Sequence, residues 1–224
     1  MLSTSFCRCL VGWLSIFTGL IFGFYIILGN VGLSQAFSGR SVVAQLDSDL
    51  QFSARLIWRA GKWSSKAQLF VKGDRYRIEH MGGIKTDLGY ATVTIVRLDK
   101  QEVWYVLSQQ RLVMAVPLTI DYLLPLSVRL DGEIRRSRIG DAVVGEQPAI
   151  LYEVEVQRGG RRESYFEWVD ESRNLLLKLV SHDRDWSGEY DRVVQSKQPD
   201  YFFETPLGYK HLKQLKNKQG RDKW

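Results

Sequence analysis

The sequence predicts a mainly β protein built from antiparallel strands. From residue 51 onward, apolar and polar residues alternate with a period of two in one segment after another, which is typical of strands that bury one face. These segments are short and end at turn residues such as Gly73-Asp74 and Gly159-Gly160. The pattern predicts about ten or eleven strands and little helix. Because so many strands cannot form a flat sheet, we expect the sheet to curl into a barrel, a half-barrel or a sandwich.

The first half of the predicted sheet is a meander. Large apolar side chains fall on every second position after residue 51, and polar side chains stand between them. Strands are expected here at residues 51–60, 67–71, 75–80, 92–98, 102–108 and 111–116. The side chains on the inward face are expected either to fill a core or to line a cavity.

An apolar insert bounded by prolines follows at residues 117–125. It is too short for a long helix and too apolar for an open loop, so we expect a helical turn or lid that lies over the sheet. Further strands are expected at residues 133–139, 149–157, 161–169, 175–181 and 189–195. The β domain is therefore expected to span residues 51–209.

The first 36 residues have the order of an export signal. Arg8 precedes an apolar run at residues 10–29, and Ser34-Gln35-Ala36 offers the small residues that a signal peptidase reads. The run has the length of a membrane span, so it predicts either a cleaved signal or a retained N-terminal anchor. Both alternatives place the body of the protein in the periplasm. Residues 37–50 are small and polar and are expected to form a linker.

The positive charge is concentrated at the end of the chain. The formal net charge is +6, but residues 210–224 contain six basic residues and one acid, so residues 37–209 are close to neutral. A nucleic-acid-binding protein carries its basic residues on a folded face, so no nucleic-acid partner is expected. The tail is either a solvated terminus or a contact with anionic lipid headgroups. The basic residues of such a contact are Lys210, Lys213, Lys216 and Lys218.

The sequence contains no motif for catalysis or metal binding. Both cysteines, Cys7 and Cys9, lie in the leader, so the mature chain is expected to have no disulfide. His80, His182 and His211 stand in separate segments without the spacing of metal ligands. There is no G-x-S-x-G elbow, Walker A loop or G-x-G-x-x-G turn. We therefore expect a protein without enzymatic activity, cofactor or metal, although an unrecognised hydrolase stays a rival interpretation.

Several segments resemble the lipoprotein-carrier (LolA-like) superfamily. Residues 72–79 (KGDRYRIE) resemble the G-x-x-(Y/F)-R strand of this family, and residues 95–100 with 103–105 (IVRLDK and VWY) resemble the hairpin that follows it. The segments GEQPA with YE, WVD and FETPLGY, between residues 145 and 209, resemble pieces of its uncharacterised exported members. The resemblance covers roughly residues 50–210, and the order of the pieces is its most specific feature.

This resemblance implies an unclosed half β-barrel, a curved antiparallel sheet with a small helical lid over an apolar concave face. It also implies a carrier that binds a lipid or an acylated lipoprotein in that cleft. Arg77 is the nearest counterpart of the arginine that locks the lid in the carrier. Other members of the superfamily sense lipid-bearing proteins, so the alternative is a membrane-anchored envelope module that binds a partner protein or acts as a sensor without a lipid ligand.

The expected binding surface combines the inward row of the strands with the lid. The cleft is expected to be lined by Phe52, Leu56, Trp58, Leu69, Tyr76, Ile78, Met114, Tyr152, Phe166 and Trp168. The lid is expected to contribute Leu118, Ile120, Tyr122, Leu123 and Leu124. Burial of an acyl chain gains about 0.8 kcal/mol for each methylene and requires no polar clamp. The lack of convergent polar motifs agrees with such a ligand, and it agrees equally with a filled core.

Overall fold

The structure is a computed structural model that describes residues 49–213. The leader expected at residues 1–36 and most of the expected linker lie outside the described residues. Among the described residues, no helical segment has the length and hydrophobicity that crossing a membrane requires. All the strands of this part belong to a single twelve-stranded sheet.

The described strands and 3₁₀ segments alternate along the chain as follows. The strands are β1 (Gln51–Ala60), β2 (Trp63–Lys72), β3 (Arg75–Thr86), β4 (Gly89–Arg97), β5 (Glu102–Leu107), β6 (Leu112–Pro117), β7 (Glu133–Val144), β8 (Gln147–Arg158), β9 (Arg161–Asp170), β10 (Leu175–Ser181), β11 (Trp186–Gln195) and β12 (Lys210–Lys213). The 3₁₀ segments are η2 (Leu98–Lys100), η3 (Ser108–Gln110), η4 (Ile120–Tyr122) and η5 (Asp200–Phe203).

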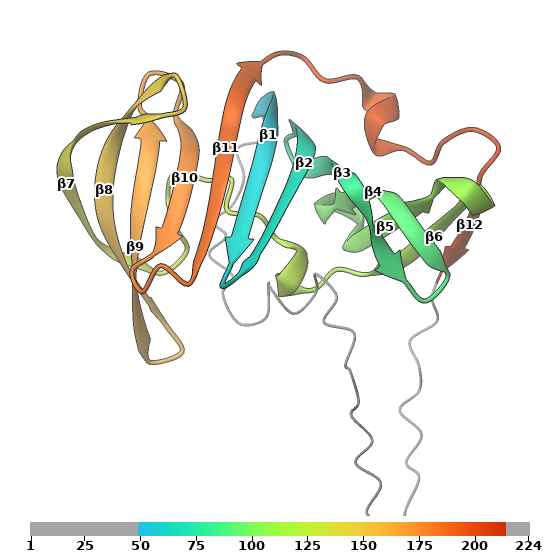
Figure 1. Ribbon diagram of the computed structural model, residues 1–224, viewed down its shortest axis with the longest axis horizontal. Helices are drawn as coiled ribbons and strands as arrows, with labels where there is room; N and C mark the ends of the chain where they lie inside the picture. Colours follow the sequence, from blue (N-terminus) through green and yellow to red (C-terminus); the bar gives the residue numbers. More distant parts are fainter. Residues whose placement is uncertain (1–48, 214–224) are drawn as a thin grey trace, which may run out of the picture. The chain divides into compact units, whose positions relative to one another are not determined.

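The sheet is open. Its strands are hydrogen-bonded in the order β12-β6-β5-β4-β3-β2-β1-β11-β10-β9-β8-β7, so β12 and β7 form its two edges. Neighbouring strands are antiparallel except for β12, which runs parallel to β6. Strand β1 lies in the interior of the sheet because it pairs with both β2 and β11 (Figure 1). The mainly β, unclosed antiparallel sheet that the sequence predicts is therefore confirmed.

Several strand boundaries differ from the prediction: β2 begins at Trp63 instead of residue 67, and β7 continues to Val144 instead of residue 139. The strand expected at residues 75–80 continues as β3 to Thr86, and Gly83 takes a positive φ of 70° where the register with β4 shifts. A bulge of this kind interrupts the ladder without ending the strand. The tail expected from residue 210 begins with β12, which pairs with residues 112–115. All four residues of β12 are exposed, so no apolar alternation marked this strand in the sequence.

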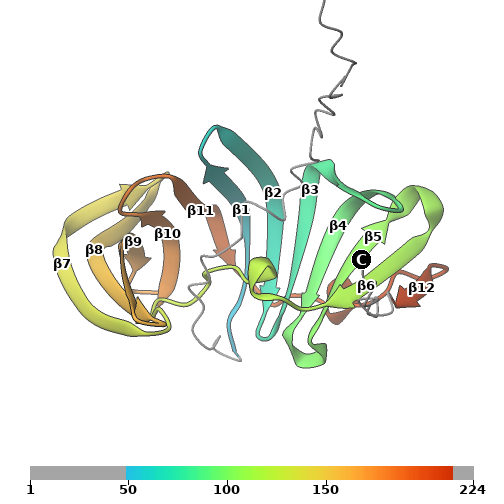
Figure 2. The same cartoon turned by 90° about the horizontal axis from the view of Figure 1, so that it is seen from below.

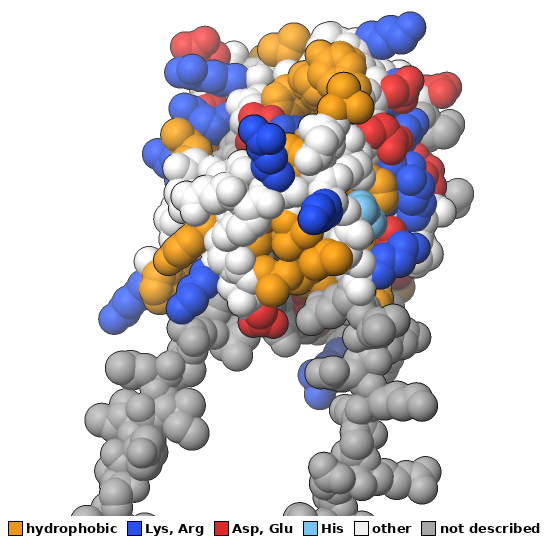
Figure 3. Space-filling view, turned by 90° about the vertical axis from the view of Figure 1, so that its right-hand side faces the viewer, with side chains coloured by type: hydrophobic (Ala, Val, Ile, Leu, Met, Phe, Trp, Pro, Cys, Tyr) orange, Lys and Arg blue, Asp and Glu red, His pale blue; other side chains and the backbone are white. Residues whose placement is uncertain are grey.

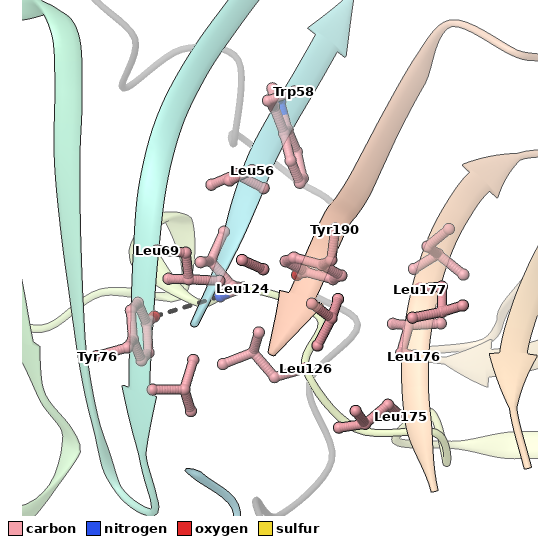
Figure 4. Packing of buried hydrophobic residues seen from close by; sticks show 14 of the residues in the cluster. Leu56, Trp58, Leu69, Tyr76, Leu124, Leu126, Leu175, Leu176, Leu177 and Tyr190 are labelled. Atoms are coloured by element: carbon pink, nitrogen blue, oxygen red, sulfur yellow. Dashed lines mark hydrogen bonds between the residues drawn. The ribbon is translucent and has the colours of Figure 1, made fainter. Parts of the chain in front are cut away.

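One face of the sheet carries the larger hydrophobic cluster. The sheet curves toward this face, which we call the concave face (Figure 2). Leu56, Leu69 and Tyr76 from β1, β2 and β3 pack there with Leu177 and Tyr190 from β10 and β11 (Figure 4). The indole rings of Trp58 and Trp186 stack on the same face with centroids 5.3 Å apart. The pairing of β1 with β11 thus joins the early and late strands in one continuous core.

Residues 118–132, which we call the strap, connect β6 to β7 and cross the concave face (Figure 2). Leu124, Leu126 and Leu130 of the strap are buried in the larger cluster. The Tyr76 hydroxyl donates to the carbonyl oxygen of Tyr122 and accepts the amide of Leu124 (Figure 4). The expected lid is thus the first part of the strap, and its helical content is the single 3₁₀ turn η4.

The opposite, convex face of β3–β6 is covered by the segment between β11 and β12. Phe203 is fully buried there in a second cluster with Ile95 and Trp104. The buried guanidinium of Arg97 donates to the carbonyl oxygen of Phe203 and to the Glu204 carboxylate, both at 3.0 Å. The members of both clusters lie between residues 50 and 209, so the described part contains its own core.

Arg77 belongs to this convex face. Its guanidinium donates to the carbonyl oxygen of Phe202 at 3.2 Å and to Glu79 at 2.7 Å. The expectation that Arg77 locks the lid is therefore wrong. Arg77 pairs with Ile95 across the β3–β4 ladder, and this register places its side chain on the face opposite to the strap.

Truncation of Phe203 tests whether the C-terminal segment stabilises the sheet. We expect Phe203→Ala to lower the free energy of unfolding by about 3–5 kcal/mol, because it leaves a cavity under η5. Tyr201→Ala removes another aromatic side chain from η5, but 72% of Tyr201 is exposed, so a change within about 0.5 kcal/mol is expected. Urea unfolding followed by circular dichroism measures both. Equal stabilities of the two variants would contradict this role of Phe203.

Candidate functional site

A pocket of about 240 Å³ lies on the concave face of β1–β6, beside the strap. Its lining residues come from all six strands, from the β3–β4 hairpin and from η4. They are Leu56, Trp58, Ser65, Ala67, Ile78, His80, Ile84, Lys85, Thr86, Asp87, Thr94, Val96, Tyr105, Met114, Val116, Asp121 and Tyr122. The pocket exists because the strap covers only part of the concave face.

The wall of the pocket is mostly apolar because the strand alternation brings one row of side chains together. In the ladder, Leu56 pairs with Ala67 and Ala67 pairs with His80. Tyr105 pairs with Met114 on the other side of the pocket. Four residues of the predicted inward row line the pocket: Leu56, Trp58, Ile78 and Met114.

Three other residues of that row are packed in the core. Phe52, Leu69 and Tyr76 have at most 2% of their surface exposed and belong to the cluster that the strap completes. The structure therefore divides the predicted row. One part lines a pocket, and the neighbouring part is filled by the strap.

The remaining three residues of the predicted row lie away from the pocket. Phe166 and Trp168 alternate with the buried residues Tyr165 and Glu167 of β9 and do not line the pocket, although Trp168 is partly buried against the larger cluster. Phe166 stacks on the His182 ring with centroids 5.4 Å apart, and the Lys178 ammonium lies 5.3 Å from the centre of the Trp168 ring. Reading Phe166 and Trp168 as inward-facing shifted the alternation of β9 by one residue, which moves a side chain to the other face.

Tyr152 occupies a polar part of the concave face. Its ring lies 5.1 Å from the Arg136 guanidinium, and its hydroxyl donates to Glu171. In the ladder Tyr152 pairs with Glu167, which is fully buried. This region belongs to β7–β9 and is not part of the pocket lining.

His80 is the most distinctive polar group in the pocket wall. Its Nε2 atom lies 2.9 Å from the Thr94 hydroxyl. Burial lowers the pKa of His80 from 6.5 to about 4, because the apolar surroundings disfavour the charged imidazolium. The imidazole is therefore neutral at pH 7, and it leaves the pocket wall without a net charge at its centre.

The strap closes one side of the pocket with Tyr122. The rings of Tyr105 and Tyr122 meet edge to face with centroids 6.2 Å apart. Burial and a hydrogen bond with Tyr122 raise the pKa of the Tyr105 hydroxyl, so it stays protonated. Lys85, Asp87 and Asp121 provide the charged groups of the lining.

The sequence did not indicate how the strap is held. The Tyr190 hydroxyl donates to the carbonyl oxygen of Pro125 at 2.8 Å. Arg136 donates to the carbonyl oxygen of Val128 at 2.6 Å and to the buried Glu167 at 2.5 Å. Together with Tyr76, these contacts hold the strap between residues 122 and 128. No local sequence motif indicates these hydrogen bonds, because each partner of the strap comes from a different strand.

Glu167 is the carboxyl group of this clamp, and burial strongly shifts its pKa. Burial raises the pKa of Glu167 to about 7, although Arg136 beside it favours the carboxylate. Its second oxygen has no hydrogen-bond partner among the described residues. The carboxyl group therefore titrates near neutral pH, far above the ordinary range of a glutamate.

The expected lid residues all belong to the strap. Leu124 is buried, and Leu118, Tyr122 and Leu123 are partly buried. Ile120 begins the 3₁₀ turn η4. Within residues 49–213, no three acidic, histidine or cysteine side chains are grouped so that they could hold a metal ion.

The expected basic tail is only partly described. Lys210 and Lys213 begin and end β12, and Lys213 forms an ion pair of 3.1 Å with Glu102. Lys216 and Lys218 lie outside the described residues. Lys213 is therefore engaged with the sheet at the start of the expected tail.

No family model matches the chain, and no curated protein matches it. Among solved structures, the crystal structure of MucB has 16% identity and a TM-score of 0.49, covering 73% of this chain and 60% of that one. MucB in complex with MucA(peri) has 15% identity and a TM-score of 0.41, covering 68% and 53%. A Vibrio parahaemolyticus domain assigned as an outer membrane lipoprotein-sorting protein has 12% identity and a TM-score of 0.24, covering 77% and 95%. The chain thus spans less than two thirds of both MucB chains, and similarity at this level concerns the fold only.

The pKa of His80 predicts a pH dependence of stability. Between pH 6.5 and 4 the unfolded chain binds a proton at His80 that the folded chain does not, so this group lowers the stability as the pH falls through that window. We expect His80→Asn to remove this contribution, which amounts to at most about 1.4 kcal/mol per pH unit. Urea unfolding of both proteins from pH 8 to 4 measures the difference.

Glu167 acts in the opposite direction, because its raised pKa lets the folded chain hold a proton below about pH 7. Both proteins contain Glu167, so its contribution cancels in the comparison. Stability curves that stay parallel from pH 8 to 4 would contradict the buried, neutral state of His80.

Proposed function

We propose that the protein binds a single apolar chain, such as one acyl chain of a lipid or of an acylated lipoprotein, in the pocket on the concave face, without catalysing a reaction. The observation that supports this proposal is the composition of the pocket wall. Leu56, Trp58, Ile78, Met114 and Val116 form a largely apolar surface. Such a wall binds hydrocarbon by excluding water from it, and no directional polar contact is required.

The size of the pocket favours one chain over a whole lipid anchor. Its volume of about 240 Å³ equals the space of about eight water molecules at roughly 30 Å³ each. Ligand pockets for larger molecules have volumes of about 300–1,000 Å³. A second acyl chain would need the space that Leu124, Leu126 and Leu130 of the strap fill.

The strap supplies a way to enlarge the pocket. It is held over the concave face by the hydroxyl groups of Tyr76 and Tyr190 and by Arg136. The hydroxyl contacts are made to backbone groups and depend little on the side chains of the strap. A carrier must release its ligand, and the part of the strap before the buried Leu124 can move at moderate cost, because it is held by few hydrogen bonds and leaves Leu124, Leu126 and Leu130 in the core.

The proposed location is the periplasm. It is supported by the order of charge, apolar run and small residues in the first 36 residues. Cleavage at Ala36 would give a diffusible carrier, whereas retention of residues 10–29 would give an anchored protein. The lipoprotein as a partner rests on the resemblance of the sequence segments to the carrier superfamily.

A second candidate function is binding of a partner polypeptide without a lipid ligand, as in a sensor. The observation in its favour is the free edge strand β7. Ile134, Ile139 and Val143 of β7 are between 48% and 65% exposed. An extended peptide could add to this edge through main-chain hydrogen bonds. Two register shifts in the β7–β8 ladder weaken this alternative, because bulges disfavour edge-to-edge pairing.

Filling the pocket tests the proposed function. Ala67 lines the pocket on β2, and its neighbour Lys66 is exposed on the other face of the same strand. We expect Ala67→Phe to abolish uptake of lauric acid, because the new ring occupies the space of the chain. Lys66→Phe adds the same ring outside the pocket and is expected to leave uptake unchanged.

Native mass spectrometry with added lauric acid measures this uptake, and circular dichroism confirms that both variants are folded. Equal uptake by the two folded variants, or no uptake by the unmodified protein, would overturn the proposed function. Extraction of the protein purified from the periplasm identifies the class of any bound lipid.

Removal of the Tyr76 hydroxyl tests the role of the strap. We expect Tyr76→Phe to accelerate the release of bound lauric acid about fivefold, because it removes a hydrogen-bond partner worth about 1 kcal/mol. The phenylalanine keeps the ring in the core, so the overall fold is expected to persist. Stopped-flow displacement of a fluorescent fatty acid measures the rate. An unchanged rate would show that release does not require movement of the strap.

A further inference from the structure

Four large apolar side chains are exposed in the β1–β2 and β3–β4 hairpins, which also carry part of the pocket lining. They are Trp63, Met81, Leu88 and Tyr90, which we call the rim, and between 45% and 78% of each is exposed. Large apolar side chains that are exposed beside the lining of an apolar pocket are candidates for an interaction site.

Each rim residue is adjacent to the lining of the pocket. Met81 follows His80 and Leu88 follows Asp87 in the chain, and both preceding residues line the pocket. Tyr90 pairs across the ladder with the lining residue Lys85. Trp63 stands two residues before Ser65, so both side chains project from the same face of β2.

The rim belongs to hairpins at one end of the sheet. The β1–β2 turn at residues 61–62 and the β3–β4 turn at residues 87–88 lie at the same end, because alternate turns of an antiparallel meander return to one side (Figure 1). The β5–β6 turn at residues 108–111 also lies there. The rim therefore belongs to two hairpins at this end, with Trp63 in the β1–β2 hairpin and Met81, Leu88 and Tyr90 in the β3–β4 hairpin.

Basic residues accompany the rim. Lys62, Lys85 and Arg111 are exposed in the three hairpins at this end. The acidic residues of the pocket lining are Asp87 and Asp121. Figure 3 shows this side of the sheet, where hydrophobic side chains gather in separate groups with lysine and arginine side chains beside them. Apolar tips with neighbouring cations match a surface that has an apolar interior and anionic headgroups.

We propose that the rim docks the protein on the surface of a phospholipid bilayer that contains anionic lipids, with the mouth of the pocket toward the membrane. An acyl chain could then pass between bilayer and pocket without crossing water. The identity of the transferred chain rests on the proposed function, whereas the docking itself depends only on the rim.

The chemistry of the rim favours a bilayer over a protein partner. Tryptophan and tyrosine are enriched at membrane interfaces, because one end of the ring is apolar and the other is polar. A stable protein interface buries about 800 Å² on each partner around a continuous apolar core. Trp63 lies in the β1–β2 hairpin and the other three side chains in the β3–β4 hairpin, with exposed Lys62 and Lys85 beside them. Such a group forms no continuous apolar core of that size, but each of its side chains can insert into the headgroup region.

The test compares variants of residues 37–224, which contain both hydrophobic clusters and lack the apolar leader. The rim variant is Trp63→Ser with Met81→Ser and Tyr90→Ser. The control variant is Ile134→Ser with Ile139→Ser and Val143→Ser, which removes three similarly exposed residues from the β7 edge. Sedimentation with vesicles of phosphatidylcholine and phosphatidylglycerol measures binding, and circular dichroism confirms the fold.

We expect the rim variant to bind the vesicles more weakly by about tenfold or more, whereas the control variant binds like the unmodified chain. Equal binding by the two variants, or no vesicle binding by the unmodified chain, would overturn the proposal and favour a protein partner for the rim. Uptake of lauric acid from solution is measured in parallel. If the rim variant takes up lauric acid normally, the docking role is separate from the pocket, and loss of uptake in all proteins would contradict only the proposed function.

Discussion

Tyr76 is fully buried on β3, and its hydroxyl donates to the carbonyl oxygen of Tyr122 and accepts the amide of Leu124. These two hydrogen bonds fix the position at which the strap turns across the concave face. Beyond this point Leu126 and Leu130 fill the face between the two halves of the sheet. Before this point the face stays uncovered and forms the pocket. A single buried phenol thus separates the filled part of the concave face from the open part.

A twelve-stranded open sheet has a second apolar face to cover, and the C-terminal segment covers part of it. Phe203 inserts over β4 and β5, and the buried Arg97 holds the backbone of this segment. Burying a guanidinium is favourable only when its donors are satisfied, and here Asp99, Glu204 and a carbonyl oxygen accept them. With their convex face packed in this way, β3–β6 form a firm wall against which a pocket on the concave face can keep its shape. We regard this covering of the convex face as a structural basis of the candidate site.

The chemistry of the pocket agrees with binding and offers little for catalysis. Its histidine is neutral at pH 7, and Tyr105 is protonated and contacts Tyr122 of the strap. The titrating pair that stands out, Arg136 with Glu167, lies in β7–β9 and holds the strap instead of facing the pocket. Among the described residues, the buried polar side chains of this face therefore position the strap. The apolar wall of the pocket is the surface that would contact a ligand. The exposed rim extends this apolar character from the pocket to the surface.

The sequence by itself determined the class of the fold and part of the pocket wall. Strand alternation is a local property, so it located nearly all the strands and placed Leu56, Trp58, Ile78 and Met114 on one face. It could not distinguish them from Leu69 and Tyr76, which have the same alternation but lie under the strap. It also misplaced Phe166 and Trp168, because an apolar residue stands at nearly every position of that part of β9. Which part of a regular face stays open, and which residues clamp the strap, was decided only by the tertiary structure, because the strap meets strands that are far away in the chain.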